Sequence, residues 1–279
     1  MISNGAIKEI ISDFEIIKSF PKSGQKSVHL VKNKNEQLLI LKVVSESDER
    51  VKREIDIVTQ NKISNVPKII SVNKIEYEGE LYLLIFEEFI QGETLKERLV
   101  KEKLTTKESM KLLESLLKIC VELEEIGVVH RDIKPDNILI RKEEFFLIDF
   151  GIARLLNDKS LTMTQAKMGP HTPGYGAPEL FQYSKKNIDS RADLFSIGVV
   201  VFESITGTHP FITGDERDVN QIWYQTVTVT PKHYIIKGDT ASQLIGFIMT
   251  LMQKHITRRP PSAKQAFEWY KAIVPTIIY

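Results

Sequence analysis

The 279-residue chain has a single cysteine, almost no net charge and no long apolar run. Cys120 alone cannot form a disulfide within the chain, and its place in an apolar helical pattern predicts a buried, inert thiol that suits a reducing compartment. The 38 Lys and Arg residues against 37 Asp and Glu leave a net charge of +1, so no global field attracts nucleic acid or an anionic membrane. Any anionic ligand must therefore be bound by local groups.

The patterns of the given sequence do not indicate a targeting or anchoring segment. The amino-terminal "MISNGAIKEIISDF" has no basic segment leading into an apolar one, and position 2 is not the glycine that myristoylation needs. The longest uncharged stretches, 194–202 and 240–253, are shorter than the roughly 18 to 20 apolar residues that cross a bilayer. We therefore expect a soluble, cytoplasmic protein with no nucleic-acid or membrane partner; the sequence does not indicate its oligomeric state.

The first third of the chain has the patterning of a β-sheet. Short β-branched and apolar runs at 27–31, 38–44 and 81–90 are separated by polar turns, which predicts antiparallel strands. Between the second and third runs, segment 47–62 places apolar residues at helical spacing on a charged background, which predicts one helix. At 42% hydrophobic residues, the chain is long enough to build this lobe and a second one.

The chain beyond Gly92 is predicted to be mostly helical. Segment 105–127 repeats apolar residues at helical spacing and ends in a glycine. Segment 190–207 also ends in a glycine and is apolar nearly all round, so it should run through the middle of its lobe. The sequence therefore predicts an α+β fold, in which a small antiparallel-sheet lobe with one helix precedes a larger, mainly helical lobe.

A dense polar cluster lies just past the junction of the two lobes, in "VVHRDIKPDNILI" at 128–140. Its position predicts that it faces a cleft between the lobes. Pro135 prevents a regular helix here, so the side chains of Asp132 and Asn137, five residues apart, can converge from one loop.

The motif "LIDFG" adds a further oxygen ligand, Asp149, and Gly151 permits a sharp turn after it. Mg²⁺ takes few protein oxygens and fills its other positions with water and phosphate, so Asn137 and Asp149 suit it as ligands. Together with Lys134 they predict a metal–phosphate site. Asp132 is not needed for the metal and is free to accept a proton.

In order and spacing these motifs resemble those of the protein kinase family, specifically the bacterial, Hanks-type serine/threonine kinases. The resemblance covers about 14–273, and implies an N-lobe at about 14–90 and a C-lobe at about 91–273, between an extension at 1–13 and a tail at 274–279. It implies a two-lobed kinase fold and an enzyme that transfers the γ-phosphoryl group of ATP to Ser or Thr hydroxyls of proteins. The expected metal is Mg²⁺, with Mn²⁺ as the alternative ion.

The resemblance also implies roles for the polar cluster. Asp132 would receive the proton of the substrate hydroxyl, while Asn137 and Asp149 would hold Mg²⁺. Lys134 would touch the transferring phosphate, and a lysine here is typical of serine/threonine rather than tyrosine kinases. Thr172, in "HTPGYGAPE", would help to position Asp132 and the substrate hydroxyl.

Two further contacts implied by the resemblance are structural. Glu179 of the "APE" motif would form an internal salt bridge with Arg259 in "RRPPSA". Asp193, in "RADLFSIG", would accept hydrogen bonds from the backbone of the catalytic loop.

In the N-lobe, Lys42 of "LILKVV" resembles the lysine that contacts the α and β phosphates, and Glu54 resembles the helix glutamate that holds it. Glu49 is a rival for that role, with poorer spacing from Lys42. The nucleotide-binding positions that the resemblance implies are Phe20, Lys22, Gly24, Lys26, Val28, Ile40, Lys42, Glu54, Glu88, Ile90 and Leu139.

The phosphate-covering loop departs from the family pattern G-x-G-x-x-G-x-V. Here it reads "PKSGQKSV", so Pro21, Ser23 and Lys26 replace the three glycines and only Gly24 is glycine. Side chains at these positions hinder the approach of backbone N–H groups to the phosphates. Lys22 and Lys26 offer point charges in compensation, the alternative being that both ammonium groups face water.

The adenine pocket departs from the family pattern as well. Ile40 stands where a small Ala forms the adenine roof, which narrows the pocket. With Glu88 and Ile90 in the hinge, Glu87 falls at the back wall of the pocket, where an apolar residue or Thr is usual. A slip of one residue would place Phe86 there instead.

Segment 157–169 is rich in hydroxyl groups and lies where the family keeps its regulatory phosphosites. We expect autophosphorylation at Thr162 or Thr164 in preference to Ser160, with Arg131 as a cation that pairs with the phosphate. The alternative is a flexible polar loop without such a role.

Two other function classes compete with this interpretation. A kinase fold can persist as a catalytically silent scaffold that binds nucleotide or protein partners; the residues at 132, 137 and 149 argue for activity. A small-molecule phosphotransferase of kinase-like fold is disfavoured by "HTPGYGAPE", a substrate-positioning segment that such enzymes generally lack.

Overall fold

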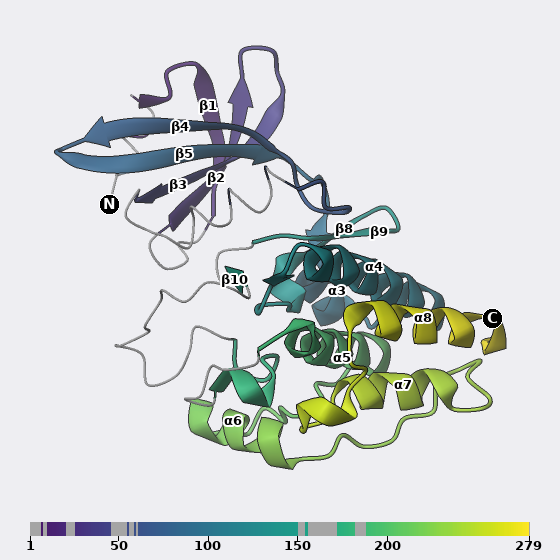
Figure 1. Cartoon of the computed structure of the whole chain (residues 1–279). Coiled ribbons are helices and arrows are strands. Elements are labelled where there is room, and N and C mark those ends of the chain that lie inside the picture. The colour runs from purple at the N-terminus through teal and green to yellow at the C-terminus, as the bar shows by residue number, and fades with distance from the viewer. Residues whose placement is uncertain are drawn as a thin grey trace. The chain divides into compact units, whose positions relative to one another are not determined.

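The computed structural model divides the chain into two compact units, residues 1–62 with 66–91 and residues 63–65 with 92–279 (Figure 1). The structure describes residues 7, 10–20, 26–45, 55, 59, 61–149, 154–155, 172–181 and 188–278.

The first unit contains a five-stranded antiparallel sheet with the strand order β1-β2-β3-β5-β4 (Figure 1). The predicted strands at 27–31, 38–44 and 81–90 are confirmed by β2, β3 and β5. The sequence patterns miss β1 and β4, because most of their side chains are exposed and no apolar run marks them. The strands are β1 (Phe14–Ser19), β2 (Lys26–Asn33), β3 (Leu38–Ser45), β4 (Ile69–Tyr77) and β5 (Glu80–Glu88).

Of the helix predicted at 47–62, Ile55 and Thr59 are described as helical, and residues 46–54, 56–58 and 60 lie outside the described part of the chain. Ile55 packs against a buried cluster of the sheet formed by Val44, Leu83 and Ile85.

The other face of the sheet carries the larger core of this unit. Leu41 and Phe86 are buried there, and the Phe86 ring stacks on Phe14 with 4.5 Å between centroids. Ile7 and Ile11, which are 1% and 4% exposed, pack into the same cluster. The segment before residue 14, which is predicted to be an extension outside the kinase domain, therefore contributes side chains to this core. The limits of the domain stay a prediction.

The second unit is mainly helical, as predicted. Helix α4 (Thr106–Glu125) begins at a capping box formed by Thr105 and Glu108, and the chain leaves it at Gly127 with φ of 68°. Helix α5 (Ser190–Thr206) ends at Gly207, whose φ is 79°. Only glycine adopts such angles without strain, which explains why both predicted helices end there. The other helices are α3 (Leu95–Lys101), α6 (Val219–Thr228), α7 (Gln243–Leu251) and α8 (Ala263–Ile273).

Helix α5 runs through the middle of this unit, as its all-round apolar sequence predicts. It packs against α4 and α7, and fourteen of its seventeen residues are buried. Cys120 of α4 is 1% exposed, which confirms the prediction of a buried thiol, and burial raises its pKa well above the ordinary value.

Short strands and 3₁₀ turns connect these helices. One small sheet has the order β6-β8-β9 and another pairs β7 with β10. Their bounds are β6 (Glu93–Thr94), β7 (Val128–Val129), β8 (Ile138–Arg141), β9 (Glu144–Leu147) and β10 (Arg154–Leu155). The 3₁₀ turns are η1 (Pro135–Asn137), η2 (Pro178–Phe181), η3 (Ile256–Arg258) and η4 (Val274–Thr276).

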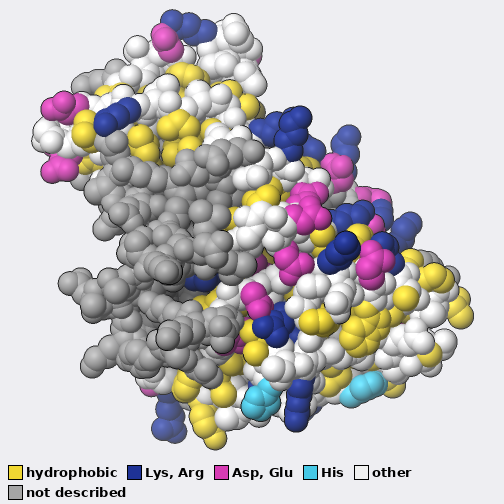
Figure 2. All heavy atoms as spheres, viewed as in Figure 1, with side chains coloured by type: hydrophobic (Ala, Val, Ile, Leu, Met, Phe, Trp, Pro, Cys, Tyr) yellow, Lys and Arg dark blue, Asp and Glu magenta, His cyan; other side chains and the backbone are white. Residues whose placement is uncertain are grey.

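The face of the molecule in Figure 2 shows blue and magenta side chains intermixed over the described helical unit, in keeping with the net charge of +1. Among the described residues, no helix combines the length and the apolar character that crossing a membrane requires.

Candidate active site

The loop that follows β7 is fixed to the core by a buried carboxylate. Asp193, in the first turn of α5, accepts hydrogen bonds from the backbone N–H groups of His130 (2.7 Å) and Arg131 (2.8 Å). Burial raises the pKa of Asp193, and the charge of His130 and the two N–H donors oppose that rise. Arg131 takes a left-handed conformation with φ of 69°. The predicted role of Asp193 in holding this loop is confirmed.

Asp132 lies at the centre of a network of side chains. Its Oδ1 accepts a hydrogen bond from the Thr172 hydroxyl (2.9 Å), and its Oδ2 lies 2.8 Å from Nζ of Lys134. Lys134 Nζ also donates to the Thr172 hydroxyl oxygen (2.6 Å), which closes a triangle of contacts. Asn137 Nδ2 donates to Oδ2 (3.0 Å) and to the backbone oxygen (2.9 Å) of Asp132. The structure thus brings together four of the predicted site residues from two separate segments of the chain.

Local backbone structure explains this convergence. Pro135 begins the single 3₁₀ turn η1, in which the Asn137 N–H donates to the Lys134 carbonyl (3.0 Å). As the sequence predicts, the proline stands at a turn and not within a regular helix. The Ile148 N–H then donates to the Asn137 carbonyl (2.9 Å), so the residue before Asp149 is fixed to the loop that carries Asp132.

Asn137 and Asp149 have the oxygen donors that Mg²⁺ prefers. Because Nδ2 of Asn137 donates to Asp132, the amide oxygen Oδ1 is the atom of this side chain that can bind a cation. Asp149 adds a carboxylate and has φ of 68°, a left-handed conformation that is uncommon for a non-glycine residue. The residues present therefore fit a magnesium ion. Gly151, expected to permit the turn that follows, lies outside the described residues.

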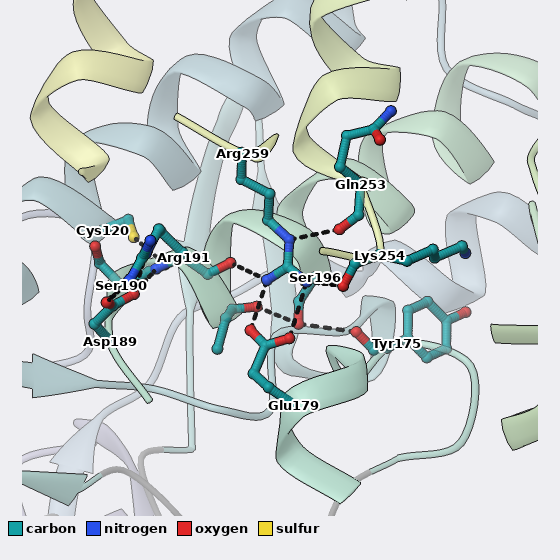
Figure 3. Close-up of polar contacts among 11 residues, drawn as sticks. Cys120, Tyr175, Glu179, Asp189, Ser190, Arg191, Ser196, Gln253, Lys254 and Arg259 are labelled. Carbon is teal, nitrogen blue, oxygen red and sulfur yellow. Dashed lines mark hydrogen bonds and ion pairs between the residues drawn. The ribbon is translucent and has the colours of Figure 1, made fainter. Parts of the chain in front are cut away.

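The segment that carries Thr172 is anchored to the helical core at two points (Figure 3). Ser196 of α5 donates its hydroxyl to the backbone oxygen of Tyr175 (2.9 Å). Arg259 makes a two-pronged ion pair with Glu179, with Nη1–Oε1 at 2.6 Å and Nη2–Oε2 at 2.9 Å. The predicted Glu179–Arg259 salt bridge is confirmed.

His209 packs against the segment that carries Thr172 and Tyr175, although no sequence motif indicates this contact. Its ring lies edge-on to the ring of Tyr175 with 4.9 Å between centroids, and its Nδ1 accepts hydrogen bonds from the N–H groups of Phe211 (3.1 Å) and Ile212 (3.0 Å). Burial lowers the pKa of His209 to about 4, and the charge of Glu216 opposes this only in part. Protonation of Nδ1 would break both hydrogen bonds.

The free energy of unfolding should therefore fall as the pH is lowered from about 6.5 to about 4. In this range the unfolded chain binds a proton at His209 that the folded chain does not, which favours unfolding by about 1 to 3 kcal/mol at the acidic end. Urea denaturation between these pH values measures the effect. His209→Asn, which keeps a hydrogen-bond acceptor but does not titrate, should lose this part of the dependence, whereas His233→Asn at an exposed site should not. Identical profiles for wild type and His209→Asn would contradict the expectation.

In the first unit, several predicted nucleotide-binding residues lie on one face of the sheet. Residues directly opposite each other on antiparallel strands share a face. Val28 lies opposite Lys42, and Ile40 lies opposite Glu87, so these four side chains belong to the same face. Phe86, which belongs to the larger core, faces the other side. Glu87 rather than Phe86 therefore shares the face of Lys42.

Lys42 forms an ion pair that sequence reasoning misses. Its Nζ lies 2.8 Å from Oε1 of Glu87, and each side chain is 9% exposed. The signal in the sequence is a glutamate at the end of an apolar strand. Of the remaining predicted positions, Phe20, Glu88 and Leu139 are half-buried and Ile90 is buried.

Other predicted site residues lie outside the described part of the chain. They are Lys22, Gly24, Glu49, Glu54, Ser160, Thr162, Thr164 and the side chain of Lys26.

Comparison with known proteins agrees with this geometry. The family model for the protein kinase domain matches residues 23–269, and the chain therefore belongs to the protein kinase family. The antiparallel sheet of the first unit and the helical second unit have the composition of the two lobes of that fold.

Among curated proteins, the serine/threonine-protein kinase pkn2 of Myxococcus xanthus is 30% identical over 225 residues, which are 78% of this chain and 26% of pkn2. The probable serine/threonine-protein kinase PknB of Bifidobacterium longum is 32% identical over 196 residues, 68% of this chain and 28% of PknB. A probable myosin light chain kinase of Dictyostelium discoideum is 28% identical over 268 residues, 92% of this chain and 82% of that protein. The chain thus spans about a quarter of the length of the two bacterial relatives.

Proposed function

We propose that this chain is a protein-serine/threonine kinase that transfers the γ-phosphoryl group of MgATP to Ser and Thr hydroxyls of protein substrates. The network around Asp132 carries the proposal. Both oxygens of this carboxylate are bound by donors from Lys134, Asn137 and Thr172, so its orientation is fixed before any substrate arrives. The similarity to bacterial serine/threonine kinases supports the same activity.

In this proposal Asp132 orients the attacking hydroxyl and accepts its proton. Lys134, whose ammonium contacts both Asp132 and Thr172, places a positive charge beside the phosphoryl oxygens. Thr172 donates its hydroxyl to Oδ1 of Asp132 and would help to position the substrate hydroxyl. Bound MgATP supplies the phosphoryl group, together with a cation that neutralises its charge.

We propose that the same chain binds MgATP through the residues that the family resemblance implies. Asn137 and Asp149 would hold Mg²⁺, with Mn²⁺ as the alternative ion, and Lys42 would contact the phosphates. The proposed adenine and phosphate contacts are Phe20, Lys22, Gly24, Lys26, Val28, Ile40, Glu54, Glu88, Ile90 and Leu139. A cytoplasmic location, without nucleic-acid or membrane partners, is part of the proposal and rests on composition and charge.

A transfer assay tests this function directly. The purified chain is incubated with ATP labelled at the γ-phosphate, Mg²⁺ and a generic basic protein, and the labelled products are hydrolysed to separate phosphoserine, phosphothreonine and phosphotyrosine. We expect label on serine and threonine. Nucleotide binding without transfer would support the silent scaffold, whereas label on a small molecule alone would support the small-molecule phosphotransferase.

We further propose that active protein autophosphorylates at Thr162 or Thr164, and less at Ser160. A phosphate in this hydroxyl-rich segment would be paired by the guanidinium of Arg131, which precedes the catalytic Asp132. Mass spectrometry of protein incubated with MgATP should find these sites modified, and Asp132→Asn protein treated in the same way should lack them. Active protein with all three hydroxyls unmodified would contradict this proposal.

A further inference from the structure

The ion pair between Lys42 and Glu87 is built entirely within the sheet of the first unit. Lys42 lies on β3 and Glu87 on the adjacent strand β5, where the register pairs Lys42 with Ile85 and Ile40 with Glu87. The two charged residues are therefore diagonal neighbours on one face. Their Nζ and Oε1 atoms are 2.8 Å apart. The hydrogen-bonded register of two strands thus fixes where the lysine meets its partner.

Burial makes this pair costly unless both partners are present. Each side chain is 9% exposed, and Glu87 follows Leu84, Ile85 and Phe86, which are buried apolar residues. A buried charge without a partner is strongly unfavourable, while two apolar side chains of similar volume stabilise a protein at least as well as a buried ion pair does. Stability alone therefore does not account for a lysine and a glutamate at these two positions.

The chemistry of Lys42 suggests what the pair does. An ammonium group has three N–H donors, so a lysine that is held by a carboxylate can also donate to a phosphate oxygen. Glu87 contacts the lysine from a strand, so the position in which it holds the ammonium group depends on the pairing of β3 with β5.

We propose that Glu87 is a positioning residue that holds the ammonium group of Lys42 in place for the phosphates of ATP. The inference rests on the proposed function, because it takes Lys42 as the phosphate-binding lysine. Glu87 would thereby supply, from within the sheet, the kind of support that the family resemblance implies for the helix residue Glu54.

Calorimetric titration with MgATP tests the inference. Glu87→Gln keeps the length of the side chain and loses its charge, and it should raise the Kd for MgATP about 3-fold to 10-fold, with a parallel rise in KM for ATP. Glu80→Gln, at the exposed opposite end of β5, is the matched control and should leave both constants unchanged. The urea midpoint of each variant, measured in parallel, separates loss of binding from loss of folding.

A double-mutant cycle shows whether Glu87 acts through Lys42. Lys42→Met should weaken MgATP binding strongly, and adding Glu87→Gln to Lys42→Met should change the Kd by less than about 2-fold, because the group that Glu87 holds is gone. If Glu87→Gln does not fold, Glu87→Met provides the same test, since its apolar side chain leaves no unpaired amide in the buried site. We expect the same rise in Kd for this variant.

The inference would be overturned if the Kd for MgATP were unchanged in both Glu87 variants, or if Glu87→Gln raised this Kd equally with and without Lys42. A lower Kd in Glu87→Gln would also overturn it, because it would mean that the carboxylate competes with phosphate for the lysine. Each of these results leaves the proposed function intact as long as Asp132→Asn strongly lowers the rate of transfer. Full transfer by both Asp132→Asn and Lys42→Met would instead reject the proposed function itself.

Discussion

Replacing Asp132 with Asn should lower kcat for phosphoryl transfer by about 10² to 10⁴. The carboxamide can still accept a hydrogen bond from the Thr172 hydroxyl, but it cannot accept the proton of a substrate hydroxyl. In the proposed mechanism Asp132 acts on the nucleophile and does not hold the nucleotide, so the Kd for MgATP should stay within about 2-fold of wild type. Steady-state kinetics and calorimetric titration of one protein preparation measure both quantities.

Asp136 provides the matched control for this prediction, since it lies four residues further along the same loop and pairs with Lys96 at 2.8 Å on the surface. Asp136→Asn should retain kcat within about 3-fold, because Asp136 is not among the proposed site residues and an exposed ion pair contributes little to stability. Asp149→Asn should instead weaken the Mg²⁺-dependent binding of ATP. Equal kcat for wild type and Asp132→Asn would contradict the assignment of an enzyme.

Replacing Arg259 with Ala should lower the free energy of unfolding by about 3 to 5 kcal/mol. The Arg259 side chain is fully buried and pairs with Glu179 through two hydrogen bonds. It also donates to the backbone oxygens of Gln253 (2.7 Å) and Arg191 (2.8 Å), as Figure 3 shows. Removing it leaves a carboxylate and these carbonyls without their donor, and a buried charge that has lost its partner is the costlier part.

Urea denaturation of Arg259→Ala measures this loss. Arg258, the preceding residue, is exposed at the end of η3, so Arg258→Ala should change the free energy of unfolding by less than about 0.5 kcal/mol. Arg259→Lys keeps the charge but not the two-pronged geometry, and we expect it to lie between the two. A loss for Arg259→Ala no greater than that for Arg258→Ala would show that the Glu179 pair does not stabilise the fold.

The sequence predicts some features of this fold well because their causes are local. Helices α4 and α5 are long, periodic and terminated by glycine, and they were expected at nearly the observed residues. Strands β1 and β4 lack such marks, because exposed strands at the edges of a sheet require no apolar run. Only their pairing with neighbouring strands defines them.

The same distinction applies to the candidate site. The Asp132 network and the Glu179–Arg259 pair follow from motifs whose order resembles that of a known family. The Lys42–Glu87 pair has no motif, since it depends on the register between β3 and β5, and a shift of one residue would turn Glu87 to the other face. His209 likewise owes its environment to packing against Tyr175, which its own neighbours in the sequence do not reveal.

The buried carboxylate of Asp193 has a consequence for the kinetics of amide hydrogen exchange. The N–H groups of His130 and Arg131 donate to it, and it belongs to α5, the helix at the centre of the second unit. Those two amides can exchange with solvent only when their hydrogen bonds to this helix open. Their protection should therefore approach that of the most slowly exchanging amides of α5, although they lie in a loop and not in a helix or long strand. The loop that carries Asp132 would then open only together with α5.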